Sequence, residues 1–330
     1  MISINQIRVN TNKILVLGNH EPIVQSILDF DYLSNHQPSV IGIITGRSGF
    51  TKYFWGQSEI LIPTLQGLSL PEKGIQKGES LTNLWLLNLT SGRRTLSSTL
   101  DFFNTKYQIH NTNLAGAALF AENVPELHSL ALINHVPKAK SQKPLIIGPA
   151  SVGLVVPGAL KLGPIGGITP DQIEESALTI PGTLAVLSAS GGMTNELINI
   201  VVQAGHKLSF ALSFGGDRFP VLSPREAFLL AEQDPQTQGV LYYGELGGED
   251  EYELVSLKKE GLFTKPVVAH IAGTVASLFP ESPQFGHAKA KADKTRVTAL
   301  AKREVMKSAG FMVSSSFSEF IKLVNNLPNT

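Results

Sequence analysis

Short apolar runs, each followed by a stretch with helical spacing of its apolar residues, recur along the whole chain. In the first half these runs are ILVL (14–17), VIGII (40–44), LWLLNL (84–89), AGAALF (115–120) and PLII (144–147). The second series consists of TLAVLS (183–188), LSFALSF (208–214), GVLYYG (239–244), PVVAHIAG (266–273) and FMVSSS (311–316). Apolar strands that alternate with helices are typical of parallel sheets covered on both faces. The pattern therefore predicts an α/β protein with two successive Rossmann-like or flavodoxin-like parallel-sheet domains.

A segment rich in glycine and proline separates the two series. PLIIGPASVGLVVPGALKLGPIGGI (144–168) is long enough to cross a bilayer, but its six glycines and four prolines would break a helix repeatedly. We therefore interpret it as a connection between domains and expect no membrane partner. A chain of 330 residues is long enough for two domains. We predict a first domain at residues 1–165 and a second at 175–330.

Composition and charge exclude several classes of protein. Apolar residues make up 42% and charged residues 16% of the chain, which favours packed cores over disorder. Lysine plus arginine equals aspartate plus glutamate at 27 each, without a basic block, so we expect no nucleic-acid partner. The lack of cysteine excludes disulfides, thiolate metal sites and a cysteine nucleophile. The N-terminal stretch has no signal-peptide pattern, and we expect a cytoplasmic protein.

Motifs for metals and nucleotides are missing or incomplete. No two of the eight histidines have the spacing of a zinc site, so we expect no metal centre. The first strand is followed by only one glycine, Gly18, where G-x-G-x-x-G needs three, so NAD binding is poorly supported. The lysine loop G-x-x-x-x-G-K-[ST] that holds ATP in many proteins is also absent from the sequence.

The turn LSASGGMTNEL (187–197) is a more specific candidate site. A predicted strand ends here, and an apolar helix is predicted at about 193–203 with Glu196 in its first turn. Two hydroxyls, the free N–H groups of a helix start and two flexible glycines would converge on one point that suits a phosphate. The residues that would contribute are Ser188, Ser190, Gly191 and Gly192. The alternative is an ordinary serine N-cap without a ligand.

Glu245 and His287 form a possible catalytic pair. Glu245 ends a predicted strand, at the sheet edge where open α/β proteins bind ligands. A carboxylate there would orient an imidazole and leave its other nitrogen nucleophilic. His287 stands in a loop, SPQFGHA (282–288), whose small residues would let it reach outward. The alternatives are an ordinary surface histidine and a solvated acidic loop, and we expect Glu249, Asp250 and Glu251 to be solvated.

These motifs together resemble those of a known enzyme family. SASGG (188–192), GELGG (244–248) and GHA (286–288) are similar, in order and separation, to signatures of the succinyl-CoA synthetase α subunit. The resemblance to the homologous region of ATP-citrate lyase is closer and covers nearly the whole chain. The stretches that carry it are LDFDY (28–32), YFWGQSEILIP (53–63), IGPASVG (147–153), SGGMTNEL (190–197), GGDRFP (215–220), EDEYE (249–253) and QFGHA (284–288).

The resemblance implies a CoA-binding domain followed by a ligase domain with a phosphohistidine loop. It implies the α-type subunit of a citrate–CoA ligase, either a citryl-CoA synthetase or a split ATP-citrate lyase. His287 would be phosphorylated, Glu245 would hold it, and the turn at 188–192 would bind the phosphoryl group. The phosphoryl group would then pass to citrate, and coenzyme A would displace phosphate to give citryl-CoA.

The same resemblance implies cofactors and partners. Mg-ATP would be bound by a separate ATP-grasp β-type subunit, and a separate citryl-CoA lyase would be a possible further partner. For coenzyme A we predict contacts with Lys52, Ser91 and Arg93, in the loops after the second and third strands.

Three positions depart from the family pattern. Ala189 stands where arginine is common, Lys289 where glycine follows G-H-A, and Asn123 where glycine is usual. Lys289 would either supply the charge missing at Ala189 or obstruct the histidine loop. These departures leave two alternatives open: a catalytically weakened homologue that acts as a CoA-binding or regulatory subunit, and a ligase for succinate or another acid.

Overall fold

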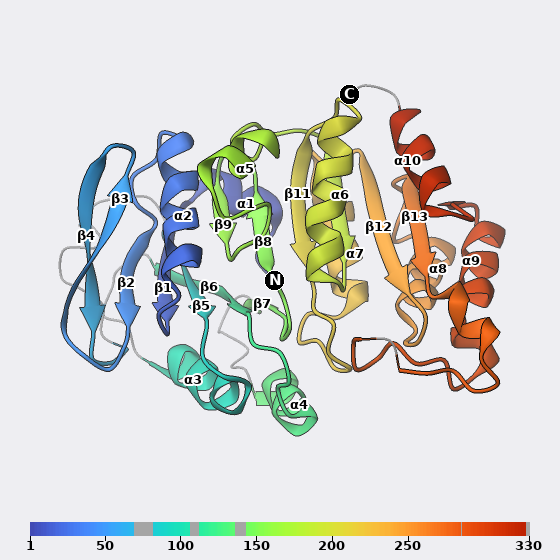
Figure 1. Ribbon diagram of the computed structural model, residues 1–330, viewed down its shortest axis with the longest axis horizontal. Coiled ribbons are helices and arrows are strands. Elements are labelled where there is room, and N and C mark those ends of the chain that lie inside the picture. Colours follow the sequence, from blue (N-terminus) through green and yellow to red (C-terminus); the bar gives the residue numbers. More distant parts are fainter. Residues whose placement is uncertain (69–81, 106–111, 136–142, 285, 328–330) are drawn as a thin grey trace.

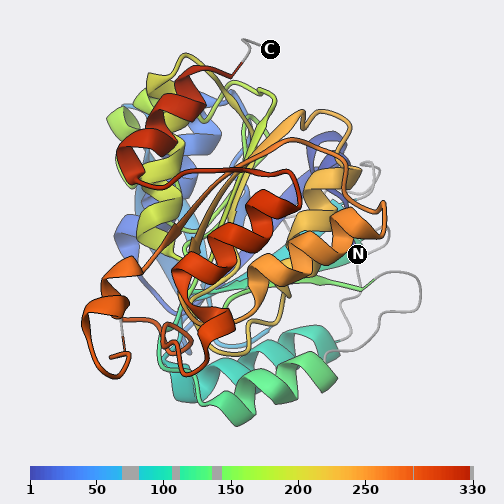
Figure 2. The same cartoon turned by 90° about the vertical axis from the view of Figure 1, so that its right-hand side faces the viewer.

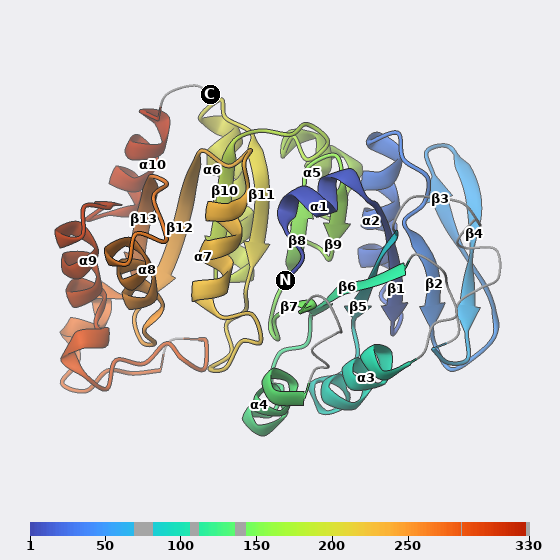
Figure 3. The same ribbon diagram turned by 180° about the vertical axis from the view of Figure 1, so that it is seen from behind.

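A computed structural model describes residues 1–68, 82–105, 112–135, 143–284 and 286–327. Two sheets of seven strands each lie side by side, with helices on their faces (Figures 1 and 3). The α/β prediction with two successive parallel-type sheets is therefore confirmed. Among the described strands, antiparallel pairing occurs only towards the sheet edges, in the pairs β3–β4, β11–β8 and β8–β9.

The first sheet has the strand order β3-β4-β2-β1-β5-β6-β7. Its inner strands are almost fully buried; all five residues of the run VIGII are inaccessible to solvent or nearly so. The strands are β1 (Thr11–Leu17), β2 (Val40–Ile44), β3 (Gly49–Trp55), β4 (Ser58–Leu65), β5 (Thr82–Asn88), β6 (Thr112–Leu119) and β7 (Leu145–Ile147). The helices of this part of the chain are α1 (Ile4–Val9), α2 (Glu21–Leu33), α3 (Gly92–Asn104) and α4 (Glu126–His135).

The second sheet has the strand order β14-β13-β12-β10-β11-β8-β9. Its strands are β8 (Gly153–Val156), β9 (Leu160–Leu162), β10 (Leu184–Ser188), β11 (Leu208–Ser213), β12 (Gly239–Glu245), β13 (Val267–Ala272) and β14 (Met312–Val313). The α-helices are α5 (Pro170–Glu175), α6 (Gly191–Gln203), α7 (Pro224–Gln233), α8 (Asp250–Lys259), α9 (Ala299–Ser308) and α10 (Phe317–Asn325). Two short 3₁₀ helices, η1 (Thr274–Leu278) and η2 (Thr295–Val297), flank the loop that carries His287.

The helices begin where their sequences offer caps. Ser223 accepts a hydrogen bond from the N–H of Glu226, whose carboxylate bonds back to Ser223, and proline follows directly at the helix start. Helices α6 and α10 cover one face of the second sheet, and α7, α8 and α9 cover the other (Figure 2). The loops that follow the strands are thereby placed at the ends of the sheet, outside both helical layers.

The segment between the two series of strands is structured. Strand β8 pairs with β11 and β9 pairs with β8, so the chain passes to the second sheet directly after β7. This crossing precedes the predicted limit of residue 165. The domain limits of 1–165 and 175–330 stay a prediction, since sheet membership alone does not define a unit that folds independently. Among the described residues, no helix is long and apolar enough to cross a membrane.

The parallel strands of both sheets run in the same direction (Figure 1). Their carboxyl ends therefore lie along one side of the molecule. In the second sheet β10 lies between β11 and β12, so the connection from β10 to β11 and the connection from β11 to β12 run in opposite directions along the sheet. Such a switch point opens a crevice at the carboxyl ends of the strands, where α/β proteins bind ligands.

Candidate active site

His287 and Glu245 contact each other at the carboxyl edge of the second sheet. His287 Nδ1 lies 2.8 Å from Glu245 Oε2, and the two side chains are 32% and 16% exposed. The hydrogen bond to Glu245 raises the pKa of His287, whereas burial and the nearby Lys289 oppose this effect. Because Nδ1–H donates to the carboxylate, Nε2 is the nitrogen left for chemistry. The structure thus brings together the two residues that the sequence predicted as a catalytic pair.

The other side of the His287 ring lies against the backbone of Gly216. A Cβ atom added at Gly216 would lie 2.4 Å from Cδ2 and 2.7 Å from Nε2 of the ring. The ring therefore occupies the space that any side chain at this position would need. Gly216 follows β11, and Glu245 ends β12, so His287 is held between the carboxyl ends of the two strands that flank β10. Sequence reasoning missed Gly216, although it stands in the family stretch GGDRFP.

The serine–glycine turn lies at the end of β10, between the two strands whose ends hold His287. Helix α6 begins at Gly191, two residues earlier than predicted, and Ser190 is its N-cap with Oγ accepting from Met193 N at 3.4 Å. Glu196 is therefore not in the first turn, and this prediction was wrong. Gly192 is exposed, and no described atom lies within 4 Å of a Cβ added there. The open start of α6 retains the free N–H groups that an anion needs.

Ser188 has a different position from the other residues of the turn. It is fully buried; its hydroxyl donates to Tyr243 O at 3.1 Å and accepts from Ser190 N at 3.0 Å. These bonds fix the turn between β10 and α6. Of the four residues predicted to hold a phosphoryl group, Ser190, Gly191 and Gly192 are thus the accessible ones, and their role stays a prediction.

A buried ion pair holds the backbone of the GELGG turn (244–248). Lys302 Nζ lies 2.6 Å from Glu251 Oε2, and both side chains are 1% exposed. The same ammonium donates to Glu245 O at 2.7 Å and to Gly247 O, while Tyr242 Oη donates to the other oxygen of Glu251. Burial raises the pKa of Glu251, and Lys302 opposes this. The expectation of a solvated Glu251 was wrong, because Glu251 lies on the buried face of α8 together with Leu254 and Val255.

Lys289 is directed into the protein. Its Nζ lies 2.6 Å from Asp250 Oδ2 and 5.2 Å from the centre of the Phe214 ring, and its side chain is 8% exposed. Its backbone O also packs against Gly247, where an added Cβ would come within 1.9 Å. Lys289 therefore ties the histidine loop to the start of α8 and to the GELGG turn. Asp250, 16% exposed at its side chain, is likewise not the solvated residue that the sequence suggested.

Two further carboxylates lie in the electrostatic environment of His287. Asp217 Oδ2 is buried and accepts no hydrogen bond within the described residues. Burial raises the pKa of Asp217, Glu122 adds to this, and His287 opposes it. Glu122 follows β6 of the first sheet and also favours the protonated form of His287, raising its pKa. Its neighbour Asn123 adopts φ +57°, which explains why glycine or asparagine suits this position.

The predicted coenzyme A contacts lie in different places on the first sheet. Lys52 belongs to β3 rather than to a loop, and its Nζ is 2.9 Å from Glu59 Oε2. Ser91 is the N-cap of α3, and Arg93 lies in the first turn of that helix. In the sheet, β4, β2 and β1 separate β3 from β5, after which Ser91 and Arg93 come. The placement of Lys52 in a loop was therefore wrong, because the residues after β2 turn back as a hairpin.

A cavity of about 510 Å³ lies at the carboxyl ends of β1 and β2. Leu17 and Ile44 line it together with polar residues of α3 and its end, including Ser98 and Asp101. Among its described lining residues the only charged side chain is that of Asp101, so the cavity suits hydroxyl and amide groups better than phosphates. None of the three predicted contacts lines it. Within the described residues, no group of three or more histidines and carboxylates could hold a metal ion.

Known proteins are similar to this chain in sequence. Residues 187–311, which contain the turn at 188–192, Glu245 and His287, match the CoA-ligase family. The ATP-citrate synthase of Mus musculus is 36% identical over 96% of this chain and 28% of its own length. ATP-citrate synthase subunit 1 of Sordaria macrospora is 36% identical over 94% of this chain and 44% of its own length.

A solved structure gives the same relationship in three dimensions. The ATP citrate lyase of Methanothrix soehngenii, in complex with citrate and coenzyme A, superposes with a TM-score of 0.84 at 34% identity. The match covers 96% of this chain and 49% of that one. The chain thus spans less than half the length of each of these relatives. It contains a CoA-ligase domain and is homologous, over nearly all of its length, to the region of ATP-citrate synthases that corresponds to the succinyl-CoA synthetase α subunit.

Proposed function

We propose that the chain is the α-type subunit of an ATP-dependent citrate–CoA ligase. The observation that carries this proposal is the 2.8 Å contact between His287 Nδ1 and Glu245 Oε2 at the switch point of the second sheet. It leaves Nε2 as a nucleophile oriented by a carboxylate, at the same end of the sheet as the open start of α6. An ATP-grasp β-type subunit would bind Mg-ATP and transfer the γ-phosphoryl group to Nε2.

Each residue then has a distinct part in the reaction. Glu245 accepts a hydrogen bond from Nδ1–H and stabilises positive charge on the ring when Nε2 bonds to phosphorus. Ser190, Gly191 and Gly192 offer hydroxyl and N–H groups to the phosphoryl oxygens. A carboxylate oxygen of citrate next attacks phosphorus, the N–P bond breaks, and His287 is regenerated. The thiolate of coenzyme A then attacks the carbonyl carbon of citryl phosphate and expels inorganic phosphate, which gives citryl-CoA.

Coenzyme A would be held by the first sheet. The cavity at the ends of β1 and β2 suits the hydroxyl and amide groups of its pantetheine arm, and Arg93 on α3 is an exposed base available for its phosphates. The carboxyl ends of both sheets lie on one side of the molecule. The long pantetheine arm of coenzyme A would therefore extend from the first sheet towards His287 on the second.

The proposal is tested by the products of the assembled complex. The chain and its ATP-grasp partner are incubated with Mg-ATP, coenzyme A and either citrate or succinate, and acyl-CoA is quantified by mass spectrometry. We expect citryl-CoA with citrate and little product with succinate. Efficient succinyl-CoA formation would reassign the acid, and the absence of any acyl-CoA from a complex that binds ATP would favour a regulatory role.

A further inference from the structure

Asp217 carries a carboxylate oxygen for which the chain supplies no hydrogen bond. Its Oδ2 is almost inaccessible to solvent and accepts no hydrogen bond from the described residues, although the residue as a whole is only partly buried. Buried polar atoms in proteins are normally paired, so an unpaired one calls for an explanation. One explanation is a group that binds here from outside the chain.

Asp217 lies on the side of the imidazole opposite to Glu245. It directly follows Gly216, where an added Cβ would lie 2.7 Å from Nε2 of His287, whereas Glu245 contacts Nδ1. His287 also lowers the pKa of Asp217, which shows that the two groups interact electrostatically. The ring therefore has one carboxylate residue at each of its two nitrogens, and Asp217 belongs to the nitrogen that the phosphoryl group would occupy.

The segment that carries Asp217 also contacts the end of the first sheet. Ala150, which follows β7, accepts a hydrogen bond from Gly216 N at 3.4 Å and donates its own N–H to Ala121 O at 2.8 Å. Glu122 comes directly after Ala121. Two backbone hydrogen bonds through one residue thus hold the segments of Glu122 and Asp217 beside each other.

Helix α3 extends this line of contacts to the predicted site of coenzyme A. Gly92 is the first residue of α3, and a Cβ added there would lie 2.9 Å from Glu122 O. The predicted coenzyme A contacts on this helix are the two chain neighbours of Gly92. A cofactor held there would bring its thiol to His287 past Glu122 and Asp217.

The last step of the proposed reaction has to remove a proton from that thiol. A thiol has a pKa of about 8.5, so most of it is protonated at neutral pH, while the nucleophile is the thiolate. An aspartate in water has a pKa of about 3.9 and is a weak base. A base with a higher pKa transfers the proton more effectively.

The surroundings of Asp217 change its pKa in this direction. Burial raises the pKa of Asp217, and Glu122 raises it further, whereas His287 lowers it. Glu126 at the start of α4 adds a smaller increase, although its carboxylate also lies 3.8 Å from Nη1 of Arg218. The carboxylate of Asp217 is therefore a stronger base than an aspartate in water.

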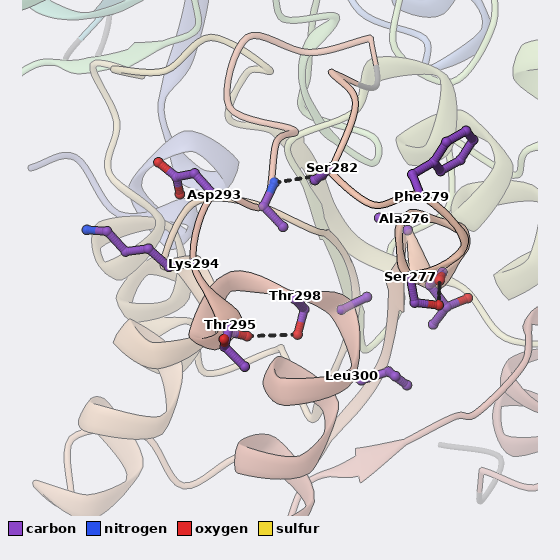
Figure 4. A pocket seen from close by; sticks show the side chains of 13 residues that line it. Ala276, Ser277, Phe279, Ser282, Asp293, Lys294, Thr295, Thr298 and Leu300 are labelled. Atoms are coloured by element: carbon purple, nitrogen blue, oxygen red, sulfur yellow. Dashed lines mark hydrogen bonds between the residues drawn. The ribbon is translucent and has the colours of Figure 1, made fainter.

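Asp293 provides a comparison, because it follows His287 on the same loop. It lines a cavity of about 350 Å³ between η1 and α9 (Figure 4). The described residues around this cavity include neither His287 nor Asp217. Asp293 is also exposed. It is thus a carboxylate of the histidine loop that lies outside the proposed reaction site.

We propose that Asp217 is the general base that deprotonates the thiol of coenzyme A. This inference rests on the proposed function, since it takes the thiol and citryl phosphate from it. The S–H bond breaks, its proton bonds to the Asp217 carboxylate, and the sulfur electron pair forms the C–S bond of citryl-CoA. The bond between the carbonyl carbon and the phosphate oxygen breaks, and its electron pair leaves with inorganic phosphate. Asp217 then releases the proton to solvent.

The test separates the thiol step from the earlier steps. The complex of the chain with the purified ATP-grasp subunit receives Mg-ATP and citrate, and then either coenzyme A or hydroxylamine, which traps citryl phosphate as a hydroxamate without first losing a proton. We expect Asp217→Asn to form citryl-CoA about 100-fold more slowly than the wild type at about pH 7, as for the loss of a general base. Its hydroxamate formation should stay within about twofold of the wild type, and Asp293→Asn should leave both rates within about twofold.

The pH dependence gives a second readout, which a merely structural role would not change. Without the base the reaction depends on free thiolate, whose fraction rises about tenfold per pH unit below the thiol pKa. The defect of D217N should therefore shrink from about 100-fold at about pH 7 to less than about tenfold at about pH 9.

Several results would overturn the role of Asp217. These are citryl-CoA formation by D217N at the wild-type rate, a defect of equal size at both pH values, and a loss of hydroxamate together with citryl-CoA, which would assign Asp217 to an earlier step. In each case a wild-type complex that forms both products leaves the proposed ligase function intact. A wild-type complex that binds ATP and forms neither product would refute that function, and the role of Asp217 with it.

Discussion

The Nδ1–carboxylate contact makes Glu245 the residue that sets both the orientation and the charge of His287. Since the hydrogen bond raises the pKa of His287, the protonated ring stabilises the folded protein at low pH, and this contribution is lost as the pH rises through that raised value. Glu245 is therefore expected to matter for the titration of His287 as well as for its reactivity.

The substitution Glu245→Gln keeps the size of the side chain but removes its charge. We expect the pKa of His287 to fall, and labelling of His287 by ATP and the partner to slow by about 10- to 100-fold, as for the loss of a hydrogen bond to a charged group. Titration of the imidazole signals by NMR measures the first effect. An unchanged His287 pKa in the variant would show that Glu245 does not hold the ring in solution.

Gly216 permits the observed position of the imidazole. Gly216→Ala places a methyl group where the ring now lies, and since His287 is 32% exposed, the ring can move aside. We therefore expect the variant to lose phosphorylation of His287 while its unfolding free energy falls by only about 1 kcal/mol, the usual size for a point substitution. Circular dichroism in urea and the labelling assay measure the two effects. Normal labelling of a folded variant would contradict the assigned ring position.

Among the elements, α8 and α9 hold the carboxyl end of β12 in position through side-chain contacts. Lys302 of α9 reaches between Glu251 of α8 and the backbone of the GELGG turn, so three elements share one buried charge pair. The loop that carries His287 is tied to the same turn through Lys289. The position of the catalytic pair is therefore set by residues distant in sequence.

The substitution Lys302→Met tests this arrangement. It leaves Glu251 buried without a partner, which is expected to cost about 3–5 kcal/mol of unfolding free energy. Without Lys302 the pKa of Glu251 rises further, so the variant should lose stability as the pH rises from about 5 to about 8. The double variant K302M/E251Q should recover much of the loss. Urea unfolding at both pH values provides the measurement, and a single variant as stable as the wild type would refute a structural role for the pair.

The elements also show how far the sequence predicts the structure. The apolar runs located the main parallel strands, because burial on both faces leaves a continuous pattern. The hairpin β3–β4 and the pair β8–β9 were missed, since partly exposed or glycine-rich strands lack that pattern. His287 and Glu245 were predicted as a pair from their places in a small-residue loop and at a strand end, and the family motifs added support. Gly216 and Lys302 were not, because their roles arise from tertiary contacts with residues far away in the chain.

At the scale of the whole molecule, one core joins the two sheets. Ile14 and Trp85 of the first sheet belong to the same contiguous apolar cluster as Leu212 and Tyr242 of the second. Arg8 of α1 adds a polar link, because its Nη2 lies 2.8 Å from Asp234 Oδ2 beyond α7. Separating the sheets would expose part of this cluster, so the two units are expected to stabilise each other.

This shared core predicts cooperative unfolding. In differential scanning calorimetry the intact chain should show a single transition whose calorimetric and van't Hoff enthalpies agree. Asp234→Asn, which weakens the link to Arg8, should lower the transition temperature without splitting it. Two resolved transitions in the wild type would contradict mutual stabilisation of the sheets.

The proposed ligase reaction requires His287 to accept a phosphoryl group. The most direct measurement incubates the chain and its ATP-grasp partner with γ-labelled Mg-ATP and locates the label by peptide mass spectrometry. We expect acid-labile, base-stable phosphate on His287, absent from His287→Asn and removed by citrate with coenzyme A. An assembled complex that binds ATP and leaves His287 unlabelled would contradict it.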